Sequence, residues 1–169
     1  MLARLLATDD SRVLTLQRLV LGGVMFPHGA QKLLGWFAPG GGFHTTMNML
    51  AQHGHVPSPI AFLVIVSEFF GSLLLAVGLF TRVAAFGCAC TMTGAILMVH
   101  LHNGFFMNWQ GVQHGEGFEY HLLALALAIP LMFRGGGALA VDGWLARYFS
   151  SRRALQPGGK TGAAPTFAV

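Results

Sequence analysis

The 169-residue chain contains only ten basic and six acidic side chains, and 54% of its residues are hydrophobic. With 23 glycines and 14 phenylalanines, this composition is typical of helices packed in lipid and disfavours a soluble enzyme core. The net charge of +4 does not indicate nucleic-acid binding, because the basic residues gather in the connections expected at one membrane surface.

Four apolar runs predict four membrane-spanning helices in an all-α fold. A helix needs about 20 residues to cross roughly 30 Å of hydrocarbon at about 1.5 Å per residue. The predicted spans cover about residues 13–37, 60–80, 83–102 and 117–133. The fourth run is short and includes Glu119 near its start, so it has to borrow length from its flanks or from local thinning of the bilayer. We expect one integral membrane domain, residues 1–153, folded as a four-helix bundle.

The chain after the fourth span is not expected to cross the membrane again. Residues 138–151 combine apolar side chains such as Leu139 and Trp144 with charged ones such as Arg147, which predicts a short amphipathic helix on the membrane surface. Residues 154–169 lack apolar periodicity and are predicted to be a disordered tail. No cleavable signal peptide is recognised, so the spans themselves are expected to insert the chain.

Basic residues are distributed unevenly among the connections between the spans. They occur before the first span, between the second and third, and after the fourth, whereas the loops 38–59 and 103–116 contain neither Lys nor Arg. The positive-inside rule then predicts that both termini are cytoplasmic and that these two loops face outward.

Polar side chains inside the apolar runs converge at one depth in the outer half of the predicted bundle. At about 1.5 Å per residue, His28 lies roughly 22 Å above the inner boundary, with Gln31 and Lys32 one turn further on the same face. Glu68 of the second span lies at nearly the same depth. The third and fourth spans bring further polar groups to this level: His100, His102, Glu119, Tyr120 and His121.

An ionised carboxylate is costly in hydrocarbon, so Glu68 is expected to face the bundle interior and either to pair with a base or to stay protonated. His28 is the first candidate for that partner and Lys32 the second. Arg18 lies about one and a half turns above the inner boundary and is expected to snorkel to the headgroups. The structural alternative is that Glu68, His28 and Gln31 form only an interhelical hydrogen-bond network.

Short motifs follow one another along most of the chain. They are Arg18, Gly22 or Gly23, Phe26 and His28-Gly29-x-Gln31-Lys32-Leu33; Glu68-x-x-Gly71-x-Leu73-Leu74-Leu75-x-x-Gly78-Leu79-x-Thr81-Arg82; Asn103-Gly104-Phe105-Phe106-x-Asn108-Trp109; Gly115-Glu116-Gly117-x-Glu119-Tyr120; and Asp142. Through these motifs the chain resembles the DoxX family of small four-helix bacterial membrane proteins over residues 13–146. The resemblance implies a multi-pass protein of the bacterial inner membrane. It also implies an association with oxidoreductase systems such as thiosulfate:quinone oxidoreductases and oxidative-stress complexes.

The chain carries no recognisable redox centre of its own. It has no haem-attachment motif, no CxxC pair and no nucleotide-binding glycine loop, which leaves a diffusible quinone or a partner protein. We expect a membrane subunit of an oxidoreductase system with a quinone-type site in the outer half of the bundle. Its predicted residues are His28, Gln31, Lys32, Glu68, His100, Glu119 and His121.

Within that predicted site, His28 or Lys32 would donate a hydrogen bond to a quinone carbonyl. Glu68 and His28 are the expected catalytic pair and would relay protons, because imidazole titrates near neutral pH. The expected partners are the lipid bilayer and other membrane or soluble redox subunits, or further copies of this chain, and no nucleic acid.

The alternative function is a non-catalytic accessory protein, or one that transports a small solute or protons through the same polar level. In its metal-binding form the ligands would be His100, Glu119 and His121, because imidazole and carboxylate groups suit Zn, Fe or Cu. The lack of inverted repeats disfavours a self-contained transporter, although a homo-oligomer would supply a second half.

Overall fold

The computed structural model describes residues 5–37, 39–52 and 54–154, and every regular element within them is a helix. The four longest are α2 (Arg12–Leu34), α4 (Ser58–Val77), α5 (Thr81–Ala95) and α6 (Glu119–Arg134). A short α3 (Phe43–Gln52) follows α2, and α7 (Val141–Ala154) follows α6. α5 continues directly into a π-helical turn, Ile96–His100, and a 3-10 turn, Leu101–Asn103.

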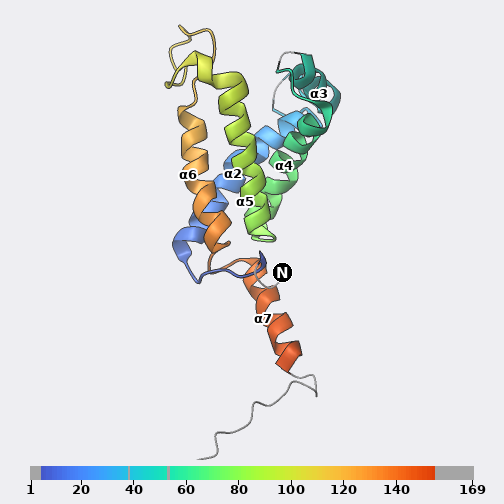
Figure 1. Cartoon of the computed structure of the whole chain (residues 1–169), viewed down its shortest axis with the longest axis vertical. Coiled ribbons are helices and arrows are strands. Elements are labelled where there is room, and N and C mark those ends of the chain that lie inside the picture. Colours follow the sequence, from blue (N-terminus) through green and yellow to red (C-terminus); the bar gives the residue numbers. More distant parts are fainter. Residues whose placement is uncertain (1–4, 38, 53, 155–169) are drawn as a thin grey trace, which may run out of the picture.

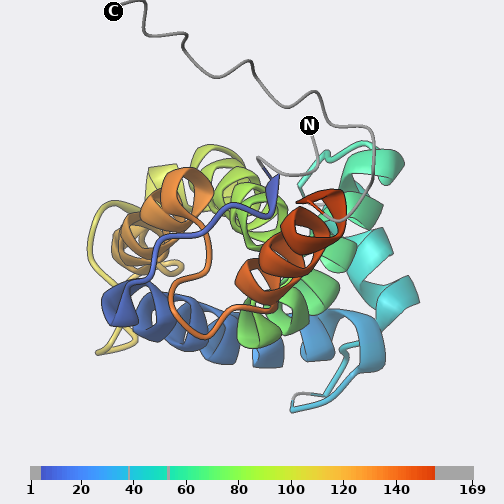
Figure 2. The ribbon, with the colours of Figure 1, turned by 90° about the horizontal axis from the view of Figure 1, so that it is seen from below.

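The four longest helices pack in a closed order. α2 contacts α4 and α6, and α5 contacts the same two helices. Figure 1 shows α3 and the connection 104–118 at one end of the molecule, here called the α3 end. The segment 5–11 and α7 lie at the opposite end, the α7 end, and the view from below in Figure 2 shows α7 in front of the other helices.

Local sequence signals set the ends of these helices. The Ser11 hydroxyl accepts a hydrogen bond from the backbone N–H of Leu14 and caps α2, which ends at Gly35 with a φ of 76°. α4 begins after Pro57 and ends at Gly78 with a φ of 73°. Glycine adopts this left-handed conformation at little cost, so both helices stop where the chain has to turn.

Two helical stretches are long and apolar enough to cross a membrane, namely Ser58–Val77 and Thr81–Asn103. α2 has 23 residues but includes several polar side chains, and α6 has 16. Large apolar side chains nevertheless point outward on all four long helices. They include Val13, Leu16, Phe62, Leu63, Phe86, Leu97, Leu123 and Phe133.

Each predicted span corresponds to a helix, and the limits differ from the predicted ones by up to three residues when the π and 3-10 turns that continue α5 to Asn103 are counted. The interpretation of residues 38–59 as a loop is wrong in part, because Phe43–Gln52 form α3. The hydroxyl of Thr46 in α3 donates to the carbonyl of Lys32 at 3.1 Å and fixes α3 to the end of α2. A helix, Val141–Ala154, is present where the surface helix is predicted at 138–151, and its location on a membrane surface stays a prediction. All of the predicted tail except Ala154 lies outside the described residues.

Candidate functional site

A cavity of about 360 Å³ lies in the half of the molecule nearer the α3 end. Its volume falls in the range of small-ligand pockets. Its apolar wall includes five methionines, Met25, Met49, Met92, Met98 and Met107, together with Leu50, Val56, Val64, Ala95 and Val99. Its polar side chains are His28, Lys32, Glu68, Thr91, His100, Glu116, Tyr120 and His121.

A buried ion pair forms one wall of this cavity. The Nζ of Lys32 lies 2.5 Å from the Oε2 of Glu68, and the side chains are 24% and 4% exposed, respectively. The base that pairs with Glu68 is therefore Lys32, the second candidate from the sequence, and not His28. His28 lies one turn earlier on α2, within electrostatic range of both charges. Ionisable groups placed this deep are expensive, which favours a functional role for the pair.

The ion pair depends on a close approach of α2 to α4. A Cβ on Gly29 would lie 2.5 Å from both the Cα and the backbone N of Phe69, and a Cβ on Gly22 would lie 2.8 Å from the carbonyl oxygen of Ser72. Only glycine allows the two backbones to come so close. This approach brings Lys32, one turn beyond Gly29, over Glu68.

The polar side of the cavity continues through a group of aromatic rings from α2, α6 and the π turn. The rings of His100 and His121 are 4.3 Å apart, and that of Tyr120 lies 6.0 Å from the ring of His28. The Nδ1 of His100 lies 2.8 Å from the carbonyl oxygen of Glu116. The π turn ends at His100 and places it on the cavity, whereas His102 is exposed elsewhere.

His121 is the most deeply buried histidine whose burial the structure describes, with 7% of its surface exposed. Its Nδ1 makes no hydrogen bond of normal geometry, although the backbone of Phe118 lies nearby. A buried imidazole nitrogen without a good partner is unusual and is available to a ligand or a water molecule.

Five of the seven predicted site residues line the cavity: His28, Lys32, Glu68, His100 and His121. Gln31 and Glu119 do not. The Oε2 of Glu119 instead accepts a hydrogen bond from the backbone N–H of Met107 at 3.4 Å, which fixes the loop. Among the described residues no group of three or more His, Cys, Asp or Glu side chains is placed to hold a metal ion. The alternative metal set of His100, Glu119 and His121 is therefore not assembled.

Several cavity residues were not predicted from the sequence. Tyr120 belongs to the predicted polar level but not to the predicted site residues, and Glu116 lies in the predicted outer loop 103–116. The signal for Tyr120 was available, because it follows Glu119 and precedes His121 in the sequence. The methionines gave no signal, since a methionine in an apolar run cannot be distinguished from a packing residue.

The expectation that Arg18 snorkels to the headgroups is wrong. Its side chain is 3% exposed and donates hydrogen bonds to four backbone carbonyls. Nε donates to Gly136 at 2.8 Å, Nη1 to Leu75 at 2.9 Å and Ala76 at 2.6 Å, and Nη2 to Leu139 at 2.9 Å. Arg18 thus binds the end of α4 and the segment between α6 and α7 to the middle of the bundle.

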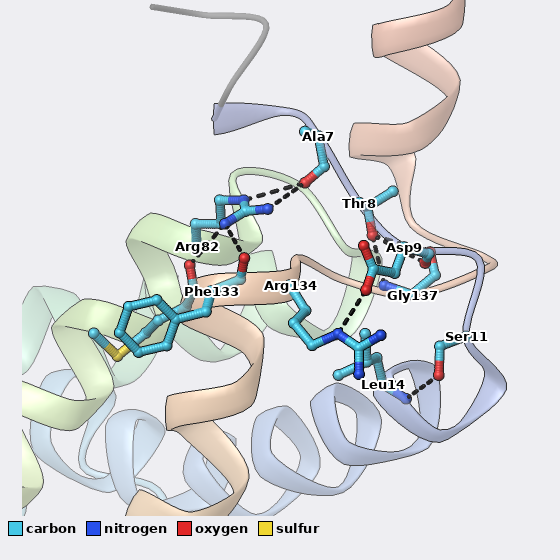
Figure 3. A network of polar contacts seen from close by, with 10 residues as sticks. Ala7, Thr8, Asp9, Ser11, Leu14, Arg82, Phe133, Arg134 and Gly137 are labelled. Atoms are coloured by element: carbon cyan, nitrogen blue, oxygen red, sulfur yellow. Dashed lines mark hydrogen bonds and ion pairs between the residues drawn. The ribbon is translucent and has the colours of Figure 1, made fainter.

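Further polar contacts hold the α7 end together, and Figure 3 shows most of those made by the segment 7–11. The guanidinium of Arg82 donates to the carbonyls of Ala7, Met132 and Phe133, and Arg134 pairs with Asp9 at 2.6 Å. Asp142 accepts hydrogen bonds from the backbone N–H groups of Phe80 and Thr81 at the start of α5.

Residues 13–101 match the sequence profile of the DoxX family. A Haemophilus influenzae protein described as "Uncharacterized protein" is 32% identical over 128 residues, which cover 74% of this chain and 84% of the relative. A Bacillus subtilis protein named "Putative oxidoreductase CatD" is 30% identical over 127 residues, covering 75% and 82%. No solved structure matches the chain. The profile match extends over more than half of the sequence, so the chain belongs to the DoxX family.

Proposed function

We propose that the protein is a multi-pass subunit of a membrane oxidoreductase system and that its cavity binds the head group of a quinone. The DoxX family is membrane-associated, and one relative carries an oxidoreductase name. The apolar outward faces of α2, α4, α5 and α6 support four crossings of the bilayer. Arg12, Arg82, Arg134 and Arg147 belong to segments at the α7 end, which supports a cytoplasmic location for that end.

The observation that carries the proposal is the division of the cavity into a polar side and a methionine-lined side. A quinone head has two carbonyl oxygens that need hydrogen-bond donors, and a flat apolar ring. Lys32, His28, Tyr120 and His121 offer donors, and Lys32 keeps further N–H groups beyond the one directed at Glu68. The methionine side chains have flexible, polarisable thioether groups, which can adapt to pack against such a ring.

A lipophilic ligand also needs space for a tail, and Gly94 on α5 marks such a space. Gly94 lines the cavity, and a Cβ added there would meet no atom within 4 Å. Its neighbours along the wall, Met98 and Val99, line the cavity and are themselves exposed. In a bilayer this side of the cavity would face the acyl chains, where an isoprenoid tail would lie.

The first test uses Gly94→Leu, which fills the open space without a backbone clash. We expect it to weaken binding of a short-tailed ubiquinone or naphthoquinone by about tenfold or more, because the side chain takes up the volume of the ligand. Binding is measured by calorimetry on the purified protein in mild detergent. Gly23→Leu is the matched control, since Gly23 is equally open but exposed on α2 and outside the cavity. Equal affinities in both variants, or no binding by the wild type, would contradict the proposal.

The chemistry proposed for this site is proton transfer to a bound quinone while a partner subunit supplies electrons. Glu68 and His28 are the proposed relay, and the positive charge of Lys32 acts on both of them. Glu68→Gln keeps the shape of the side chain but cannot relay a proton. We expect the variant to bind quinone and to lose turnover in membranes that contain the assembled complex. Full turnover with full binding would exclude the relay.

A further inference from the structure

Ionisable groups form a row from the buried ion pair to the α3 end, with ring separations of 4.3 to 6.0 Å along it. Beyond Lys32 and Glu68, the row passes His28 and Tyr120, whose rings are 6.0 Å apart. From Tyr120 to His121 the ring separation is 5.7 Å, and from His121 to His100 it is 4.3 Å. His100 then contacts the carbonyl of Glu116 in the connection 104–118.

In the direction of the α7 end the described part of the chain has no such row. The stretches 19–27 of α2, 69–77 of α4 and 122–133 of α6 contain no ionisable side chain, and on α5 the stretch 83–90 contains only Cys88 and Cys90. Between His28 and Arg18 on α2 this leaves about 15 Å of helix. The buried side chains there are mainly Leu21, Leu75, Ala124, Ala128 and Leu131. The nearest cation, Arg18, donates four hydrogen bonds to backbone carbonyls.

We propose that His121 and His100 form a proton connection from the cavity to the α3 end, so that the Lys32–Glu68 pair exchanges protons with that side of the membrane alone. The inference deepens the proposed function, on which it rests for the identity of the site whose protons move. It adds the route and its direction, which the proposed relay of Glu68 and His28 leaves open.

The hydrogen bond of His100 fits this role. The carbonyl of Glu116 can only accept, so the Nδ1 of neutral His100 carries the proton and its Nε2 is left as an acceptor. A proton leaving the His121 ring can therefore bind to the Nε2 of His100, directly or through one water molecule. Release of that proton to water at the α3 end returns His100 to its starting state, and no electron moves in these steps.

Charged and titratable groups from every surrounding element lie near this pair. His28 and Lys32 come from α2, Glu68 from α4, Cys88 from α5 and Tyr120 from α6, and Glu116 comes from the connection 104–118. His28 and Lys32 act electrostatically on His121 from the side of the ion pair, whereas Glu116 contacts His100 from the connection at the α3 end. A change of protonation at His121 is therefore transmitted electrostatically to the ion pair and has no comparable route toward the α7 end.

The test follows the protonation of buried groups by infrared spectroscopy of sealed vesicles after a pH step on one side. The full-length protein is reconstituted with the connection 104–118 outward, as verified by labelling of Gln113→Cys. We expect a downward step of the external pH to give a difference signal that is lost in Glu68→Gln. His121→Phe should slow the signal by about tenfold or more, and an internal step should give none.

Two further variants make the result independent of a single substitution. His100→Phe should slow the signal as His121→Phe does, at a position that is less buried. His102→Phe is the matched control and should leave it unchanged, because His102 is exposed and outside the cavity. An equal response to internal pH, wild-type rates in both slowed variants, or no signal in the wild type would overturn the inference. The infrared experiment uses no quinone, so its outcome is separate from that of the quinone-binding test.

Discussion

At the scale of single residues, the Lys32–Glu68 pair has a high desolvation cost and lies directly on the cavity wall. Glu68 is nearly excluded from solvent, whereas part of the Lys32 side chain remains exposed. A pair of this kind contributes little net stability compared with apolar side chains of the same size, because both charges lose their hydration. Its position next to a cavity is more readily explained by chemistry than by stability.

Because Lys32 and Glu68 differ in exposure, the loss of one side chain should not cost the same stability as the loss of the other. Lys32→Met leaves a carboxylate buried without a partner and should destabilise the protein by about 3 kcal/mol. Glu68→Gln should cost less, because the remaining ammonium group can turn toward its exposed side. The double variant should recover most of the loss of Lys32→Met. Thermal unfolding midpoints in mild detergent give the order; a Lys32→Met protein as stable as the wild type would show that Glu68 does not depend on this base.

At the scale of helices, the contact between α2 and α4 positions the pair. Gly29→Ala would place a methyl group 2.5 Å from the backbone of Phe69, where no side-chain rotation can relieve the overlap. We expect a loss of about 1–3 kcal/mol and weaker quinone binding, because α2 has to move away from α4 and carries Lys32 with it. Gly23→Ala, which meets open space, should be neutral or slightly stabilising. If both variants bind quinone as the wild type does, the site does not require this close approach.

The same helices show what the sequence could and could not predict. Run length and depth along a helix are local properties, so the four long helices and the common level of His28 and Glu68 were predictable. Depth does not give the direction in which a side chain points, so the choice of Lys32 over His28 required the α2–α4 contact. The burial of Arg18 could not be predicted, because its carbonyl partners come from α4 and from residues 136–139, which only the folded chain brings to it.

At the scale of the whole molecule, the two ends have opposite characters. The α7 end is closed by arginine hydrogen bonds and an ion pair, while the α3 end carries the cavity, the histidines and a loop with exposed aromatic side chains such as Trp109. A proton route confined to one end is useful only if that end has a fixed side of the membrane. The functional proposals therefore depend on which side of the membrane the α3 end faces.

Orientation can be measured with single cysteines in a background of Cys88→Ala and Cys90→Ala, which removes both native thiols. We expect Gln113→Cys in the connection 104–118 to react with a membrane-impermeant maleimide in spheroplasts, because that connection has no basic residue and is predicted to face outward. Ser150→Cys in α7, an exposed position at the basic end, should react only after the membrane is permeabilised. The reverse pattern would turn the cavity and its histidines toward the cytoplasm, and the proton connection would then open to the inside.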